Sequence, residues 1–190
     1  VDVLNKELQQ LEGQGFSTTH VFVDHRAHLI MPYHIAEDIA REKARGVYQI
    51  GTTKRGIGPT YMDKLSRVGL RVADLFGDEA KLHQKIELIL AEKNPMLKQF
   101  DTETFTIAEV MEVAHRYRQV LQTRVIDGVI EINAALREEK RIMFEGAQAV
   151  MLDIDHGTYP YVTSSSPTSG GISSGAGVAP SNIHNVIGVS

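Results

Sequence analysis

The stretch HVFVDHRAHLIMPYHIAEDIAREKARG, residues 20–46, carries the clearest local signals of fold class in this chain. Its first part, HVFVDH, is a short run of β-branched and aromatic residues, which favours a strand over 20–25. The residues HLIMP predict a second short strand, which ends at Pro32. Proline is common at the first position of a helix, and the apolar residues after it recur at helical spacing as far as Gly46. Because strands and helices mix, the stretch indicates an α/β fold.

Other elements are expected on both sides of this stretch. A leucine pattern predicts a helix over 1–12, and a loop over 47–58 precedes a short helix that Pro59 opens and that runs to Arg67. Residues 77–140 form a long helical stretch by periodicity, which Asn94-Pro95 should break and Gly128 should bend or divide. The period then changes: RIMFEG at 141–146 and VIGVS at 186–190 both predict buried strands.

Length and composition exclude several classes of protein. The 190 residues are 42% hydrophobic and 23% charged, which is typical of one globular domain or a little more. The chain has no cysteine, so disulfides and thiolate metal sites are excluded. No apolar run reaches the length of a membrane span, and the net charge of −4 gives no overall attraction to nucleic acid.

The loop GTTKRGIGPTYMDK, residues 51–64, is the strongest candidate for a binding site. Its glycines allow backbone N–H groups to converge on an anion, its threonines add hydroxyl donors, and Lys54 and Arg55 add charge. Residues 51–71 hold five basic residues and one acidic residue in an otherwise acidic chain. That imbalance favours a small anionic ligand. A surface loop with solvated charges remains the alternative, and the residue order is not that of a Walker A loop.

Three further motifs have a structural and a functional interpretation. Arg67 suits a phosphate bidentately, although for an arginine taken by itself an ion pair with a surface carboxylate is the favoured reading. The residues FEGAQ, 144–148, follow a predicted strand, where Gln148 could contact a ligand or simply lie in a turn. Asp153, Asp155 and His156 could bind a divalent ion or transfer protons, although hydrogen bonds within a tight turn are the favoured reading.

The segment TSSSPTSGGISSGAG, residues 163–177, has the composition of a flexible linker. Predicted buried strands flank it on both sides, and linkers seldom run directly into a buried strand. We therefore expect an ordered segment with hydrogen-bonded and partly buried backbone.

Taken together, three motifs closely resemble the adenylosuccinate synthetase family: GTTKRGIGPTYMDKLSRVGLRVADLF, FEGAQAVMLDIDHGTYPYVTSS and SGAGVAP. The likeness runs along essentially the whole chain and is weakest over 77–140. Two local departures affect the expected backbone geometry: Ala149 stands where the family commonly has glycine, and Ser166-Pro167 where it commonly has asparagine.

The resemblance implies a central part of a single synthetase domain, built on a mainly parallel sheet flanked by helices. Enzymes of this family use GTP to join IMP and L-aspartate through a 6-phosphoryl-IMP intermediate, in the committed step from IMP to AMP. They require Mg²⁺, act as homodimers and work in the cytoplasm. This ligase activity is the function expected of the full-length protein, and the isolated chain is expected to be inactive.

Family roles carry over to four matching residues. By resemblance, Thr53 binds the 5′-phosphate of IMP, and Arg67 reaches that phosphate from the neighbouring subunit. Gln148 and Thr163 match two further IMP contacts. The family's catalytic aspartate and histidine have no counterpart here, so no catalytic residue and no metal ligand is expected in this chain. The aspartate-binding loop and the guanine-recognition segment are expected downstream of Ser190. The alternative is a non-catalytic fragment or phosphate-binding module that keeps only part of the IMP site.

Overall fold

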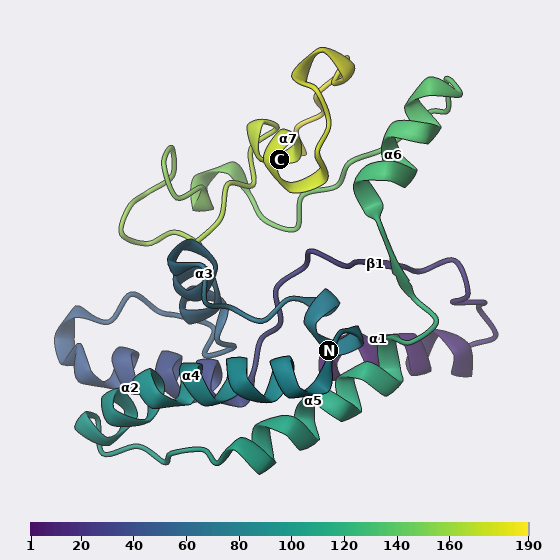
Figure 1. Cartoon of the computed structure of the whole chain (residues 1–190). Helices are drawn as coiled ribbons and strands as arrows, with labels where there is room; N and C mark the ends of the chain where they lie inside the picture. Colours follow the sequence, from purple (N-terminus) through teal and green to yellow (C-terminus); the bar gives the residue numbers. More distant parts are fainter. Residues whose placement is uncertain (190) are drawn as a thin grey trace. The chain divides into compact units, whose positions relative to one another are not determined.

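Helices dominate the computed structural model, which describes residues 1–189 (Figure 1). The chain forms two units, an N-terminal unit of Val1–Ile126 and a C-terminal unit of Asp127–Ser190. The N-terminal unit contains five α-helices: α1 (Asp2–Gly13), α2 (Pro32–Ala44), α3 (Ile57–Ser66), α4 (Glu79–Gln99) and α5 (Ile107–Leu121). It also contains two 3-10 turns, η1 (Gly46–Tyr48) and η2 (Val72–Phe76).

The described sheet is short and parallel. Strand β1 (Val23–Asp24) pairs with β2 (Val125–Ile126), with Val23 opposite Val125 and Asp24 opposite Ile126. Both the α/β class and the parallel pairing are therefore confirmed. The strand expected over 20–25 is reduced to two residues, and β2 interrupts a region that periodicity had assigned to helix.

The second expected strand, over 28–32, is wrong as a strand. Its only ladder contact among the described residues is an antiparallel bridge between His28 and Arg71, next to a bond from Leu29 N–H to the Leu70 carbonyl (2.9 Å). Leu29 and Met31 are fully buried, so burial explains the apolar pattern. An apolar run alone does not supply the neighbouring backbone that a strand requires.

Local capping signals set the starts of several helices. The Asp78 side chain accepts a bond from the Lys81 N–H (3.1 Å) at the start of α4. Thr106 and Glu109 exchange bonds with each other's backbone at the start of α5, which is a capping box. The expected helices over 1–12, 32–46 and 59–67 match α1, α2 and α3 within about two residues, the usual uncertainty of helix ends.

The hydrophobic core lies entirely in the N-terminal unit. It joins the chain before α2 with α2, η2, α4 and α5, and Val23 and Val125 of the sheet pack against it. Helix α4 packs on α2 and α5, and α3 packs on α2 (Figure 1). The most deeply buried side chains of this core are Met31, Tyr33, Leu70, Ile86, Leu97, Val110 and Leu121.

Helix α4 does not break at Asn94-Pro95, as the sequence had suggested, but continues to Gln99. A proline inside a helix removes one hydrogen bond and costs about 3 kcal/mol. Burial of Leu90 and Leu97 on either side offsets that cost. The Asn94 side chain also ties α4 to the chain before α5, because it bonds both the N–H (3.0 Å) and the carbonyl (2.8 Å) of Phe105.

The C-terminal unit contains α6 (Gly128–Arg137), η3 (Val150–Leu152), α7 (Gly170–Ala176) and η4 (Pro180–Asn182), with α6 packed on α7. Helix α6 begins at Gly128, so the expected division there is confirmed. Its cap is Asp127, which accepts a bond from the Ile130 N–H (3.1 Å).

The strands expected over 141–146 and 186–190 are wrong for the described residues. Neither 141–146 nor 186–189 has a paired neighbour there, and Met143, Ile187 and Val189 are strongly exposed; residue 190 lies outside the described residues. Without a partner strand, an apolar run cannot complete a ladder.

The serine- and glycine-rich segment 163–177 is ordered. It forms α7 and bonds back to the preceding turn, for example from the Ile154 N–H to the Ser165 carbonyl (3.1 Å). Its residues are half-buried or exposed, so the expected burial is only partial.

Candidate functional site

The glycine loop between η1 and α3 has the unusual backbone that its composition predicted. Gly51, Lys54 and Gly56 all have positive φ, at 75°, 55° and 77°. Glycine adopts this region at no steric cost, whereas lysine does so rarely. At Gly56 a Cβ would also lie 3.0 Å from backbone atoms of His34 and Ile35, so the loop packs tightly against the start of α2.

Two buried carboxylates of α2 hold this loop. Glu42 Oε1 accepts the N–H groups of Gly51 (2.7 Å) and Thr52 (3.4 Å), and Asp38 Oδ2 accepts the N–H of Gly56 (3.0 Å). The sequence had suggested that the loop's N–H groups converge on a ligand anion. These three bind protein carboxylates instead. Burial raises the pKa of Glu42, but the backbone bonds outweigh it, so the pKa lies below its ordinary value.

Thr53, Lys54 and Arg55 lie between these two attachments and are exposed. None of their backbone N–H groups donates a hydrogen bond within residues 1–189. Helix α3 follows immediately, and the positive end of its dipole lies at Gly56, where the Thr60 hydroxyl donates to the Gly56 carbonyl (2.7 Å). The loop therefore presents free N–H donors, a threonine hydroxyl and two cations on one short stretch.

Arg67 ends α3 in the left-handed region, with φ of 66°. Its side chain is exposed and forms no ion pair in the described part of the chain, so pairing with a surface carboxylate does not explain it. Met62 and Leu65, one helical turn apart on the same helix, are exposed as well.

A network of hydrogen-bonded side chains, most of them buried, connects α3 to α2 and α4. His34 Nε2 donates to Asp63 Oδ2 (2.9 Å), and Lys93 Nζ donates to Asp63 Oδ1 (2.5 Å) and Glu37 Oε2 (2.8 Å). Arg41 Nε completes the network with a bond to Glu37 Oε1 (2.7 Å). The network connects α2, α3 and α4, so it fixes the helix that carries Arg67.

The pKa directions follow from this arrangement. Burial dominates at His34 and lowers its pKa, although Asp63 opposes the shift. At Asp63, burial raises the pKa, but hydrogen bonds from His34 and Lys93 outweigh it and leave the pKa below its ordinary value. His34 Nδ1 accepts the Met31 N–H (2.9 Å), so the neutral ring carries its proton on Nε2.

Sequence reasoning missed these buried acids. The apolar spacing in α2 rested on Ile35, Ile39, Ala36 and Ala40. Ala36 and Ala40 are buried as expected, but Ile35 and Ile39 are exposed, while Glu37, Asp38 and Glu42 are buried. A search for apolar periodicity cannot find charges that are buried because they are paired. One sequence signal could have indicated these acids: Asp38 and Glu42 are four residues apart, so they lie on the same face of the helix that precedes the glycine loop.

The other two predicted site residues, Gln148 and Thr163, lie in the C-terminal unit. The Ser165 hydroxyl donates to Gln148 Oε1 (3.4 Å), and the Thr163 N–H donates to the Leu152 carbonyl (2.8 Å). The segments that carry these two residues are thus held near each other within this unit.

Asp153 organises the turn that joins them. Its Oδ1 accepts the N–H groups of Asp155 (2.9 Å) and His156 (3.1 Å), and its Oδ2 accepts the N–H of Thr168 (3.4 Å). The bond from the Asp155 N–H is the largest influence that lowers the pKa of Asp153. The structural reading of Asp153 is confirmed, because backbone donors already occupy this carboxylate.

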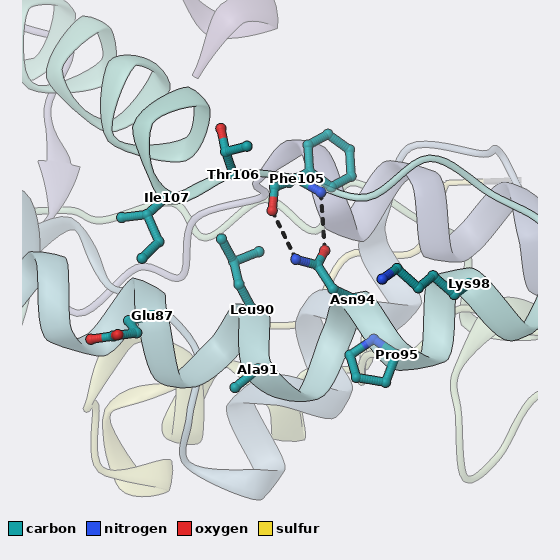
Figure 2. A pocket seen from close by; sticks show the side chains of 9 residues that line it. All are labelled: Glu87, Leu90, Ala91, Asn94, Pro95, Lys98, Phe105, Thr106 and Ile107. Atoms are coloured by element: carbon teal, nitrogen blue, oxygen red, sulfur yellow. Dashed lines mark hydrogen bonds between the residues drawn. The ribbon is translucent and has the colours of Figure 1, made fainter.

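A separate hollow lies between α4 and the start of α5, away from the glycine loop in sequence (Figure 2). It has a volume of about 410 Å³ and a mostly apolar lining that includes Leu90, Pro95 and Ile107. Figure 2 shows the Asn94 amide bonded to Phe105, so the polar group here is satisfied. This hollow contains none of the predicted site residues.

Comparison with known proteins gives concordant findings. The family model described as adenylosuccinate synthetase matches residues 1–190. Adenylosuccinate synthetase of Bacillus cereus is 49% identical over 187 residues, which are 98% of this chain and 43% of that protein. The Listeria welshimeri enzyme of the same name is 48% identical over the same length.

A solved structure agrees as well. The chain matches fully ligated adenylosuccinate synthetase from Plasmodium falciparum with a TM-score of 0.80 and 32% identity, over 94% of this chain and 42% of that one. The chain thus spans about 43% of the length of the curated relatives it matches. In the described residues, no helix is long and apolar enough to cross a membrane.

Proposed function

The chain belongs to the adenylosuccinate synthetase family, and from this premise we propose that it is the central part of a GTP-dependent ligase that joins IMP and L-aspartate. The reaction forms adenylosuccinate through 6-phosphoryl-IMP, in the biosynthesis of AMP. The observation that carries the proposal is the segment 53–55, which presents the Thr53 hydroxyl, two cations and N–H groups that have no partner within residues 1–189. Such a set of donors suits a phosphate.

In this proposal, four residues bind IMP. Thr53 donates its hydroxyl to the 5′-phosphate, and the exposed N–H groups of 53–55 lie on the same loop. Gln148 and Thr163 supply further contacts to IMP. The bonds that Ser165 and Leu152 make with them limit their movement, which reduces the entropy lost when a ligand binds.

Arg67 serves the neighbouring subunit of a homodimer. The guanidinium at the end of α3 supports this role, because it is exposed and has no ion-pair partner within residues 1–189. Met62 and Leu65 also support it, since they add exposed apolar surface on the same helix. An arginine beside exposed apolar side chains is a common composition for an interface.

Magnesium, GTP and aspartate are assigned to other parts of the full-length protein. Glu37, Asp38, Glu42 and Asp63 already accept bonds from backbone N–H groups, His34, Lys93 or Arg41, so they do not fit a magnesium ion. A cytoplasmic location is part of the proposal and agrees with the absence of cysteine.

The direct test is product formation. The full-length protein, given IMP, GTP, L-aspartate and Mg²⁺, is expected to form adenylosuccinate, and omission of any one of these should stop the reaction. The isolated chain of 190 residues is expected to form none, because phosphoryl transfer depends on positioned charge and metal that these residues do not supply. Product from the isolated chain would show that its residues contain a complete catalytic site.

A mixing experiment tests the shared site. Arg67→Leu and Thr53→Ala in the full-length protein should each weaken IMP binding far more than GTP binding. A charge-assisted phosphate contact contributes on the order of 1.5–3 kcal/mol. A random mixture of the two variants should recover about a quarter of wild-type activity, because half of the dimers contain one intact site. If mixed dimers form without any recovery, Arg67 does not act across the interface.

A further inference from the structure

The two carboxylates of α2 that hold the glycine loop have no role in the function described so far. Asp38 and Glu42 are four residues apart, so they lie one turn apart on the same face of the helix. They bind opposite ends of one short segment: Glu42 holds Gly51 and Thr52, and Asp38 holds Gly56. The exposed residues 53–55 lie between the two attachments.

Burial makes these attachments strong. Asp38 is 6% exposed and Glu42 is 3% exposed, and a buried carboxylate without partners is costly. Hydrogen bonds from N–H groups to a carboxylate are roughly twice as strong as those between neutral groups. Glu42 also forms an ion pair with Arg45, with 3.5 Å between Oε2 and the guanidinium Nη1. The loop N–H groups therefore stabilise the buried carboxylates, and the carboxylates in turn fix the position of the loop.

The attachments also explain the strained backbone of the segment. Between the two fixed ends, Lys54 has positive φ, and Gly51 and Gly56 at the ends have positive φ as well. Strain at a non-glycine residue persists only where the surrounding structure enforces it. Here the carboxylates bind N–H groups on either side of residues 53–55, and the N–H groups of 53–55 have no partner within residues 1–189.

We propose that Asp38 and Glu42 are positioning residues that hold residues 53–55 in the conformation that binds phosphate. The inference rests on the proposed function, because it takes the phosphate of IMP as the ligand of this loop. Neither carboxylate touches the ligand. Each accepts backbone N–H groups at one end of the segment and leaves the N–H groups and the Thr53 hydroxyl between them available to the anion.

A purely structural role predicts something different. If the carboxylates only attached the loop to α2, their loss would lower the melting temperature and leave the KM for IMP unchanged in the folded protein. If they position the segment, the KM for IMP rises while the KM for GTP does not. Rescue by an amide is a second readout, because an amide oxygen can still accept the N–H bonds that a hydrocarbon cannot.

The experiment compares Glu42→Met and Glu42→Gln in the full-length protein. Methionine keeps the length of the side chain but accepts no comparable bond, whereas glutamine keeps an acceptor oxygen. We expect Glu42→Met to raise the KM for IMP by about tenfold, which corresponds to about 1.4 kcal/mol, close to the lower end of what one charge-assisted bond contributes. The KM for GTP should stay within about twofold, and Glu42→Gln should restore most of the IMP affinity. Glu92→Gln, an exposed change on α4, is the control.

Each result has a defined meaning. If the wild-type protein does not bind IMP in a calorimetric titration, the proposed function fails. If the wild type binds IMP but Glu42→Met leaves its KM unchanged, or raises the KM values for IMP and GTP equally, the positioning role is overturned. Should Glu42→Met not fold, Asp38→Ala and Asp38→Asn give the same comparison at Gly56. Asp38→Ala is then expected to raise the KM for IMP but not the KM for GTP, and Asp38→Asn to restore most of the IMP affinity.

Discussion

His34 has both ring nitrogens engaged inside the protein. Nδ1 accepts the Met31 N–H and Nε2 donates to Asp63, and the side chain is fully buried. A second proton would occupy Nδ1, so it would break the bond to Met31 at the start of α2. It would also put a further charge beside Lys93. Both effects favour the neutral ring in the folded state.

This arrangement predicts how stability depends on pH. The pKa of His34 is lowered from 6.5 in the folded state, so the unfolded chain binds the proton at a higher pH than the folded chain. The stabilisation is therefore complete above pH 6.5 and is lost as the pH falls through the window below it. A single proton limits the slope to about 1.4 kcal/mol per pH unit.

Urea denaturation of the N-terminal unit between about pH 7.5 and pH 5.5 measures this effect. The free energy of unfolding is expected to fall with pH in the wild type and to fall less in His34→Gln. His83→Gln, at an exposed position on α4, controls for the loss of a histidine. Equal slopes in wild type and His34→Gln would mean that His34 does not titrate differently in the two states.

At the scale of elements, the success of sequence reasoning depended on how local the signal was. The bounds of α2 and α3 could be predicted because Pro32 and the glycine loop act on adjacent residues. The strand over 141–146 could not, because pairing depends on backbone from elsewhere in the chain. The burial of the acids of α2 could not be predicted for a similar reason, because the Glu37 carboxylate is paired with Lys93, which is 56 residues away in the sequence. The roles of Thr53 and Arg67 toward IMP could be expected from the motifs, but the attachments that hold the loop are visible only in the structure.

Helix α4 leads to a prediction about Pro95. The helix continues through this residue, so Pro95→Ala would supply an N–H that can bond the carbonyl of Ala91 one turn earlier. We expect the variant to be more stable, by about 1 to 3 kcal/mol, since proline costs about 3 kcal/mol in a helix interior and part of this is offset in the unfolded chain.

Thermal and urea unfolding of Pro95→Ala would measure the gain. The matched control is Pro32→Ala at the first position of α2, where proline interrupts no helical bond and no gain is expected. A loss of stability in Pro95→Ala would indicate that the proline ring makes packing contacts worth more than the missing hydrogen bond.

At the scale of the whole molecule, the two units differ sharply in burial. The core cluster lies within the N-terminal unit, whereas in the described part of the C-terminal unit only Asp153 and Val178 are buried. Regions with few buried apolar contacts open at low free energy. The isolated chain should therefore show slow amide exchange in α4 and α5 and fast exchange over 141–146 and 186–189, whose N–H groups donate no backbone hydrogen bond within residues 1–189.

Hydrogen exchange read by mass spectrometry tests this contrast, and the full-length protein is the informative comparison. If segment 141–146 pairs with strands of the longer protein, its amides should exchange slowly there while those of α4 stay unchanged. Equal, fast exchange of this segment in both proteins would show that it does not pair with another strand in the full-length protein.

The two hydrogen bonds between the Asn94 side chain and the Phe105 backbone depend on the amide remaining intact. Asparagine in proteins slowly deamidates when the backbone nitrogen of the next residue attacks its side-chain amide, and aspartate here could no longer donate to the Phe105 carbonyl. The next residue is Pro95, whose nitrogen carries no hydrogen and is already fully substituted, so this cyclisation is blocked. The proline that costs α4 a hydrogen bond thus protects, over the lifetime of the protein, the amide that joins α4 to the start of α5.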